Sequence, residues 1–308
     1  MGLAEVWRGS ANAWECDELG HLNVAGYFAK FNEAVLGFAC ELNLGHIGYA
    51  EAPSVLRPRE IHVRFLAEVR PGAPLSIHAG LMDLDEDSVA VFFEMRDGQD
   101  QPAATWRARL VHETPETGKR FSWPGRIHSR VAGLRTELPE YALPKGLAAP
   151  ETGVEPHLDD ADRHGLVQTG RGVFQHLECD AGGRIGADRF MGRLSDSVTN
   201  FSAAFPEIAR QYAQGEALSV STALLEARWR YQRWPRPGDH FIVRSALAEA
   251  RPKTRRLIHW FFDPRSRQPW CGVEAVNGML NLQTRRLEET TPDVLSALQA
   301  QAQPDLTP

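Results

Sequence analysis

The amino-acid sequence carries one pattern twice, 163 residues apart. Residues 2–20, GLAEVWRGSANAWECDELG, match residues 165–183, GLVQTGRGVFQHLECDAGG, at eight of nineteen positions. Typical residue frequencies would give roughly one identity over this length. The match continues in residues 61–81 and 227–247, which share the run Arg-Pro-Gly after a small change of offset. Because this period exceeds any solenoid repeat, we expect a duplicated domain rather than a solenoid.

Each copy is predicted to contain a short strand, one helical segment and then several long strands. The helical segments are residues 24–42 and 187–205, and in the first of them apolar residues recur at spacings of three and four, which is typical of one buried helix face. Asp97 and Gly98, and residues 263–269, mark turns between strands. The strands are expected at 74–84, 88–97, 104–114, 240–250, 255–263 and 270–284. One helix followed by an antiparallel sheet indicates the α+β class.

The boundaries of the two copies follow from a change in composition between them. The chain has 308 residues, which is comfortable for two domains. Residues 138–156 are rich in Pro, Gly and Ala, as is typical of a linker on the surface. We therefore predict an N-terminal domain over 1–126, a linker over 127–163, a C-terminal domain over 164–290 and a tail over 291–308.

Charge and composition exclude several classes of protein. A net charge of −6 argues against a dedicated nucleic-acid binder, which usually carries a basic face. No apolar run approaches the roughly 18–20 residues that span a bilayer, and the N-terminus does not read as a secretory signal. The four cysteines show no CxxC spacing, which argues against a zinc site and favours a reducing cytoplasm. We therefore expect a cytoplasmic protein that binds neither nucleic acid nor membrane.

The phrase ECDELGHLN opens a motif that resembles a known family. The motif is Asp-x-x-Gly-His-x-Asn-x-x-x-Tyr, formed by Asp17, Gly20, His21, Asn23 and Tyr27, and the helical acid Glu33 follows it. It resembles the signature of hotdog-fold thioesterases. These include the 4-hydroxybenzoyl-CoA thioesterase type and the acyl-acyl-carrier-protein (acyl-ACP) thioesterases. Residues 279–294 resemble the closing strand of acyl-ACP thioesterases. The resemblance implies two tandem hotdog domains, each an antiparallel sheet wrapped around a long central helix. It also implies an acyl-thioester site near the start of such a helix.

Thioester hydrolysis requires an attacking oxygen and donors for the oxyanion that forms. We assign Asp17 as nucleophile or general base, although an Asp at a helix start is often only a cap. Backbone N–H groups near Asn23 and Val24, at the positive end of a helix, are the expected oxyanion donors. His21 and Asn23 would orient water or donate hydrogen bonds. Their structural alternatives are a buried histidine and a helix N-cap.

Three further residues of the first copy have open roles. Glu33 would reach the same site if its helix face turned inward, and would otherwise be a solvated helix residue. Tyr27 is expected to pack in the core or to border the substrate. Cys16 lies between two acids, which would raise the pKa of its thiol and argue against a nucleophilic cysteine.

The second copy keeps the acids of the phrase but loses its neutral hydrogen-bonding groups. Asp180 and Asp196 stand at the positions of Asp17 and Glu33, whereas Arg184 and Gly186 replace His21 and Asn23, and Phe190 replaces Tyr27. One interpretation is a degenerate site in which Arg184 pairs with Asp180. The other is a second working site with different positioning groups. We favour degeneracy.

Basic residues of the second copy suggest a binding role for phosphate groups. Arg228 and Arg230 would project from one face of a strand, with Trp229 and Tyr231 on the other. Coenzyme A carries three phosphate groups, which arginine suits. The alternative is an ordinary solvated strand face.

Together these features predict an acyl-CoA thioesterase that needs no metal and no organic cofactor. An acyl-ACP thioesterase and a hotdog dehydratase are the enzymatic alternatives, and a non-catalytic acyl-CoA binding module is the alternative from another class. The family habit of pairing also makes a homodimer plausible.

Overall fold

The computed structural model describes residues 2–147, 155–180 and 182–308, and the chain divides into two compact units. Unit 1 comprises Met1–Leu143, Phe174–Gly192 and Trp234–Gly238, and unit 2 comprises Pro144–Val173, Arg193–Arg233 and Asp239–Pro308. The units therefore do not coincide with the two sequence copies. Two segments of the second copy belong to unit 1. One of them contains its ECD phrase, ECDAGGRIG at residues 178–186, which corresponds to ECDELGHLN at residues 15–23.

The strands of unit 1 form an antiparallel sheet in the order β1-β3-β4-β5-β2. Their bounds are β1 Ala4–Ser10, β2 Val55–Phe65, β3 Pro74–Leu84, β4 Ser88–Arg96 and β5 Pro102–Glu113. The predicted turn at Asp97 and Gly98 is confirmed, because it joins β4 to β5, and the Asp97 carboxylate accepts the N–H groups of Gln99 and Gln101. The three strands predicted for the first copy are likewise confirmed.

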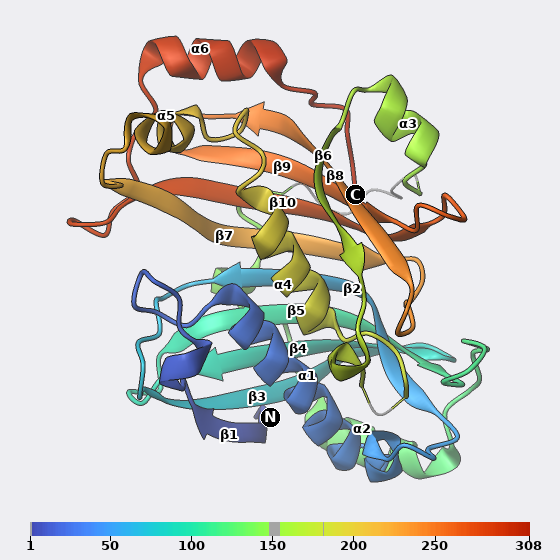
Figure 1. Ribbon diagram of the computed structural model, residues 1–308. Coiled ribbons are helices and arrows are strands. Elements are labelled where there is room, and N and C mark those ends of the chain that lie inside the picture. Colours follow the sequence, from blue (N-terminus) through green and yellow to red (C-terminus); the bar gives the residue numbers. More distant parts are fainter. Residues whose placement is uncertain (1, 148–154, 181) are drawn as a thin grey trace. The chain divides into compact units, whose positions relative to one another are not determined.

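Helix α1, Val24–Glu41, lies across the strands of unit 1 (Figure 1). Its apolar face is buried, and the Phe31 ring stacks on Trp106 of β5 at 5.4 Å and meets Phe93 of β4 edge-on at 5.1 Å. Gly37 lets the helix approach β1, since a Cβ there would lie 2.0 Å from the carbonyl oxygen of Val6. The helix predicted over 24–42 is confirmed, and its buried face holds it against the sheet of unit 1.

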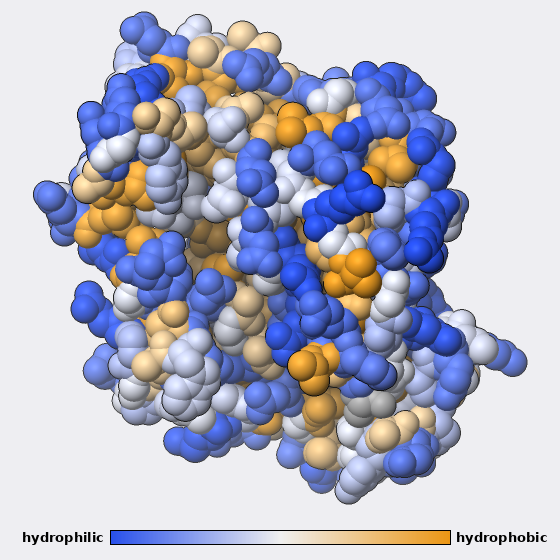
Figure 2. Space-filling view, viewed as in Figure 1, coloured by the Kyte–Doolittle hydropathy of each residue, from blue (hydrophilic) through white to orange (hydrophobic). Residues whose placement is uncertain are grey.

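The strands of unit 2 form a second antiparallel order, β7-β10-β9-β8-β6. Their bounds are β6 Val167–Val173, β7 Val220–Tyr231, β8 His240–Ala250, β9 Thr254–Phe262 and β10 Pro269–Asn281. Helix α5, Pro206–Gln214, and helix α6, Pro292–Gln301, pack against a cluster that includes Phe201, Leu257 and Leu298. Hydrophobic side chains reach the surface on the α5 side of this unit (Figure 2).

The helix predicted over 187–205 is shorter than expected. Helix α4 covers Ala187–Val198, and the chain then turns before α5 begins at Pro206. Thr199 and Asn200 have low helix propensity, and a residue before proline disfavours the helical conformation. The segment therefore breaks into two helices instead of continuing as one.

The segments predicted as linker and tail contain further helices. Helix α2, His128–Leu134, and helix α3, Leu158–Arg163, lie within the predicted linker, of which residues 148–154 are outside the described residues. The predicted tail contains α6, and its Leu298 and Leu306 are buried. Within the described chain, no helix is both long and apolar enough to cross a membrane.

Candidate active site

The first ECD phrase folds as a small hairpin directly before α1. A 3-10 turn, Ala13–Glu15, leads into a bridge between Cys16 and Leu22. The Asp17 N–H donates to the His21 carbonyl at 3.0 Å, and the Gly20 N–H donates to the Asp17 carbonyl at 3.0 Å. Gly20 has a φ of +76°, the left-handed conformation that ends such a three-residue loop. The glycine of the phrase therefore closes the loop that holds Asp17 and His21 together.

Asp17 lies beside an imidazole, and within the described residues it forms no ion pair with a lysine or arginine. Its Oδ1 accepts the Leu19 N–H at 3.0 Å and lies 3.5 Å from Nδ1 of His21. The side chains of Asp17 and His21 are each 18% exposed. The other ring nitrogen of His21, Nε2, faces Oε1 of Glu68 at 3.9 Å. The carboxylate is thus within reach of solvent and is next to a group that can exchange a proton with it.

The other two residues of the phrase hold it against α1. Glu15 accepts the N–H and the side-chain amide of Asn12 and forms an ion pair with Lys30 of α1, whose Nζ lies 2.7 Å from Oε1. The Cys16 thiol donates to the Asn12 carbonyl. Burial, and then the charges of Asp17 and Glu15, raise the pKa of this thiol, as predicted. Glu15 and Cys16 therefore serve the scaffold.

The start of α1 differs in one respect from expectation. The Asn23 side chain accepts the Ala25 N–H at 2.9 Å and is the N-cap. The Asn23 N–H donates to the Glu15 carbonyl at 2.9 Å, so it is not available as an oxyanion donor. Among the described residues, the Val24 N–H has no hydrogen-bond partner. Of the two predicted donors, only Val24 remains.

Glu33 and Tyr27 lie on different sides of α1. Glu33 is exposed and accepts a hydrogen bond from Nε1 of Trp7 at 2.9 Å; within the described chain it makes no hydrogen bond or ion pair with Asp17 or His21. Tyr27 is buried, packs edge-on against Phe65 and donates through its hydroxyl to the Ala67 carbonyl at 3.3 Å. The structure brings Asp17, His21 and the helix start together, and it places Glu33 elsewhere.

The second ECD phrase repeats the same hairpin within unit 1. The Asp180 N–H donates to the Arg184 carbonyl at 2.7 Å, and the Gly183 N–H donates to the Asp180 carbonyl at 3.0 Å. Gly183 also has a positive φ, +66°, and Cys179 forms a bridge with Ile185. The two copies therefore share one backbone scaffold, and they differ in the side chains that it carries.

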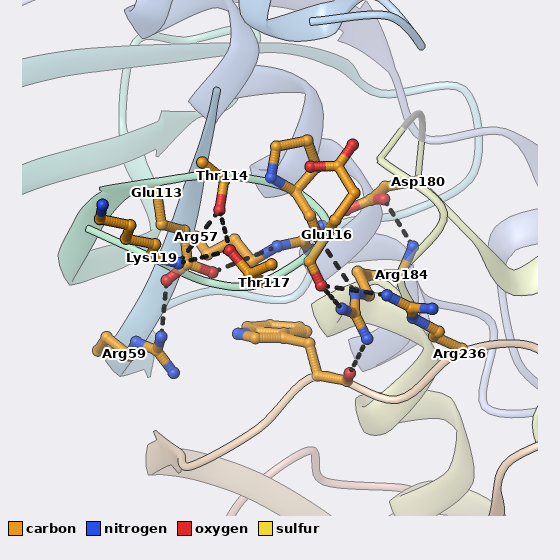
Figure 3. A network of polar contacts seen from close by, with 12 residues as sticks. Arg57, Arg59, Glu113, Thr114, Glu116, Thr117, Lys119, Asp180, Arg184 and Arg236 are labelled. Carbon is orange, nitrogen blue, oxygen red and sulfur yellow. Dashed lines mark hydrogen bonds and ion pairs between the residues drawn. The ribbon is translucent and has the colours of Figure 1, made fainter. Parts of the chain in front are cut away.

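Asp180 is paired with an arginine (Figure 3), a partner that Asp17 does not have among the described residues. Nη1 of Arg57, on β2, lies 2.8 Å from Oδ2 of Asp180. Arg57 is 4% exposed, and its Nε lies 3.6 Å from Glu113, which also pairs with Arg59 at 2.6 Å. The Asp180 carboxylate is 40% exposed. It is therefore one end of a largely buried chain of alternating charges.

Arg57 takes the place that the sequence suggested for Arg184. The Arg184 guanidinium donates to the carbonyls of Pro115, Glu116 and Trp234 at 3.3, 2.6 and 3.1 Å, and its contact with the Asp180 carboxylate is a backbone N–H at 3.0 Å. Arg184 thus fastens the hairpin to the loop after β5 (Figure 3).

A residue in the middle of α1, Asn32, contacts Asp188 at the start of α4, and both residues belong to unit 1. The Asn32 side chain donates to Oδ1 of Asp188 at 2.8 Å, and burial raises the pKa of Asp188 despite Arg189 nearby. A Cβ at Gly186 would lie 2.5 Å from that same oxygen, so a counterpart of Asn23 would require the Asp188 carboxylate to move. In unit 2, Asp196 is exposed and lies 3.8 Å from Arg193.

The two arginines predicted to bind phosphate differ in exposure. Arg228 is buried and pairs with Glu274 at 3.3 Å, so its guanidinium does not present itself to a phosphate in solution. Arg230 is half-buried, with Nη1 3.5 Å from the Pro308 carbonyl. Trp229 and Tyr231 stack on each other on the opposite strand face, as expected. Throughout the described residues, no cluster of three or more His, Cys, Asp or Glu side chains is arranged to hold a metal ion.

Comparisons with known proteins agree with the duplicated hairpin and sheet. Residues 11–131 and 174–298 match the sequence model of the thioesterase-like superfamily. No curated protein gives a significant sequence match. The fold is similar to that of a proposed oleoyl thioesterase from Lactobacillus plantarum, with 12% identity, a TM-score of 0.66, and coverage of 90% of this chain and 97% of that one.

Two acyl-ACP thioesterases have similar folds. The enzyme from Bacteroides thetaiotaomicron is 12% identical with a TM-score of 0.63, over 88% of this chain and 96% of the other. The 12:0-ACP thioesterase from Umbellularia californica is 9% identical with a TM-score of 0.60, over 89% and 93%. The resemblance of the Asp17–Tyr27 motif is confirmed by the family match, which covers well over half of the chain. The protein therefore belongs to the thioesterase-like superfamily and is a thioester hydrolase built from two tandem hotdog repeats.

Proposed function

We propose that the protein hydrolyses an acyl-CoA to a free acid and coenzyme A, and that Asp17 is the reacting carboxylate. The observation that carries this proposal is the contrast between two hairpins with one backbone. Asp17 is partly exposed and lies next to the His21 imidazole, whereas Asp180 is held by the buried Arg57 guanidinium. The Asp180 carboxylate is engaged by the Arg57 guanidinium at 2.8 Å, and we assign it a structural role.

The chemistry at Asp17 has two routes. As general base, Asp17 removes a proton from water while the oxygen bonds to the thioester carbon, and the carbon–sulfur bond then breaks as the proton returns to the thiolate or to solvent. As nucleophile, the Asp17 carboxylate attacks the thioester carbon and expels the coenzyme A thiolate, and water then hydrolyses the resulting anhydride to the free acid and Asp17. The Val24 N–H, at the positive end of α1, is the proposed donor to the oxyanion in either route.

The arrangement of α1 suggests where the acyl group would lie. We propose that α1 is the central helix of its hotdog repeat, with its buried apolar residues bordering the acyl site. His21 and the N-cap Asn23 would orient the water or the carbonyl. We also propose a cytoplasmic location and a homodimer.

An acyl-ACP is the second candidate substrate. The specific observation in its favour is that two solved structures which match this chain almost end to end are named acyl-ACP thioesterases. The carrier protein is acidic, so this alternative requires a basic surface around the site, and the net charge of −6 gives it no support. Direct comparison of both carriers with the same acyl chain separates the two candidates.

The test is a thiol-release assay on a panel of acyl-CoAs and acyl-ACPs. Asp17→Asn is expected to lower kcat at least about 100-fold, because it removes the base or nucleophile. Asp180→Asn removes the same charge from the equivalent hairpin and is the matched control, expected to keep kcat within a few-fold of the unmodified protein. Loss of turnover in Asp180→Asn instead would contradict the assignment. If no thioester in the panel is cleaved, titration calorimetry with the same acyl-CoAs would test the non-catalytic binding module.

A further inference from the structure

A second carboxylate stands behind the histidine of the proposed site. Glu68 lies in the loop between β2 and β3, and its Oε1 is 3.9 Å from Nε2 of His21. On the other side of the ring, Nδ1 is 3.5 Å from Oδ1 of Asp17. The imidazole of His21 therefore lies between two carboxylates, one on each ring nitrogen. Glu68 has a side chain 36% exposed, so this array runs from Asp17 toward solvent.

Hydrogen bonds to the residues on either side of Glu68 hold its loop against the hairpin. The Leu22 N–H donates to the carbonyl of Val69 at 2.7 Å. The Tyr27 hydroxyl donates to the carbonyl of Ala67 at 3.3 Å. These two bonds join the residues on either side of Glu68 to the hairpin and to the first turn of α1. These bonds place the backbone of Glu68 beside the hairpin, from where its side chain reaches His21.

The second copy keeps this backbone arrangement and replaces its polar groups together. The Ile185 N–H donates to the Pro235 carbonyl at 3.0 Å, which repeats the bond from Leu22 to Val69. At the shifted offset of the matched stretch, Trp234 stands in the place of Glu68. Arg184 and Phe190 stand in the places of His21 and Tyr27, and the Phe190 ring meets Trp234 edge-on at 5.9 Å.

Because Glu68 and His21 are replaced together, the two copies show whether Glu68 is needed to hold its loop or is needed only where the histidine is present. If Glu68 served only to hold its loop, the second copy would need an equivalent carboxylate, because it holds the same loop in the same way. It has an indole instead, and the histidine that Glu68 faces is also absent there. The carboxylate is present in the copy that has the histidine and absent from the copy that has only the backbone arrangement.

We propose that Glu68 is a positioning residue for the Asp17 site, acting through His21. This inference rests on the proposed function. The Glu68 carboxylate, 3.9 Å from Nε2, attracts a proton on that nitrogen and so favours the tautomer in which Nδ1 faces Asp17. When Asp17 has taken a proton from the attacking water, Nδ1 can share it, and the Glu68 charge stabilises the doubly protonated ring until the proton passes to the departing thiolate or to solvent.

The test combines substitutions of Glu68 and His21 in the thiol-release assay. Glu68→Gln, which keeps the shape, is expected to lower kcat about tenfold with KM unchanged, the scale on which groups that orient a reacting residue act. Glu68→Asp should recover part of this loss. In a His21→Asn background, Glu68→Gln should change kcat by less than about twofold, because its target is gone. Glu18→Gln removes one exposed charge from the same hairpin and is the control, with kcat unchanged.

Several outcomes would overturn the proposal. An equal loss of kcat from Glu68→Gln with and without His21 would mean that Glu68 acts independently of the histidine, and no loss at all would mean that it does not act. If the unmodified protein cleaves no thioester, the proposed function fails separately. In that case, ¹⁵N NMR of the His21 ring still decides the positioning role. A tautomer that is the same in the unmodified protein and in Glu68→Gln would refute it.

Discussion

Lys30 is a buried cation beneath the candidate site, and its removal makes a sharp test of what holds the hairpin in place. The side chain is 3% exposed, and its Nζ lies 2.7 and 2.8 Å from the two carboxylate oxygens of Glu15. It also lies 5.3 Å from the centre of the Trp7 ring. Lys30→Met keeps the apolar stem and removes the charge, so it leaves Glu15 without its cation.

The expected cost follows from the burial of the pair. Breaking a buried ion pair on one side costs about 3–5 kcal/mol, because the remaining charge is left uncompensated. Glu15 is 21% exposed and keeps two hydrogen bonds from Asn12, so we expect the lower part of this range, about 3–4 kcal/mol. A loss of about 3 kcal/mol would reduce the folding equilibrium constant of unit 1 on the order of 100-fold.

The pH dependence gives a second, independent signature. Burial raises the pKa of Glu15, but the hydrogen bonds from Lys30 and Asn12 outweigh it, so the pKa lies below the usual 4.5. A carboxyl with a lowered pKa contributes stability that is present above its unfolded value and is lost as the pH falls through the folded value. The penalty of Lys30→Met should therefore be full at pH 7 and should shrink as the pH falls below about 4.5.

Urea denaturation followed by tryptophan fluorescence measures this penalty. Lys30→Arg is the conservative control, since arginine stands at the same place in the second copy as Arg193, and it should cost less than about 1 kcal/mol. Adding Glu15→Gln to Lys30→Met should recover most of the loss, because no charge is then buried alone. A single Lys30→Met that unfolds at the same urea concentration as the unmodified protein would refute the reasoning.

Three further predictions concern stability. Burial raises the pKa of Asp188, so stability falls as the pH rises through its folded value; Asp188→Asn should raise the thermal midpoint at pH 7 and make no difference near pH 3. Burial lowers the pKa of His259 to about 3, so stability should fall between pH 6.5 and 3 by up to about 1.4 kcal/mol per pH unit, and His259→Gln should flatten that slope in urea titrations. Gly37→Ala should cost about 1–3 kcal/mol in the same titrations, because its Cβ meets a carbonyl of β1, whereas Gly192→Ala, which meets nothing, should be neutral or stabilising.

The strands and α1 were predictable because each is specified locally. Long apolar runs ending at turn residues define the strands, and the three- and four-residue spacing around Phe31 defines the helix. The second helix was predicted too long because its apolar pattern continues past Val198, whereas backbone preference before Pro206 ends it. Local pattern gives the presence of an element more reliably than its end.

The candidate site was predictable only as far as its residues are neighbours in sequence. Asp17 and His21 lie in one hairpin, so their spacing alone places them together. Glu68 and Arg57 come from other elements, and no local motif marks them. The signal that could have found Glu68 is the repeat itself, since a carboxylate in one copy aligns with Trp234 in the other.

The two hairpins also differ in a residue outside the ECD phrase. Substitutions within the phrase therefore cannot by themselves give Asp180 the surroundings of Asp17. Arg57, which holds Asp180, lies on β2, and at the offset of the matched stretch its counterpart on β7 is Ala223. The alignment is consistent in structure, because β2 and β7 have irregularities in register at matching positions. The double substitution Arg184→His and Trp234→Glu would give Asp180 the polar neighbours that Asp17 has. Asp180 would still be bonded to the buried guanidinium of Arg57. We propose that a carboxylate of this scaffold reacts where an imidazole lies beside it and no arginine is paired with it; among the described residues, Asp17 meets both conditions and Asp180 meets neither.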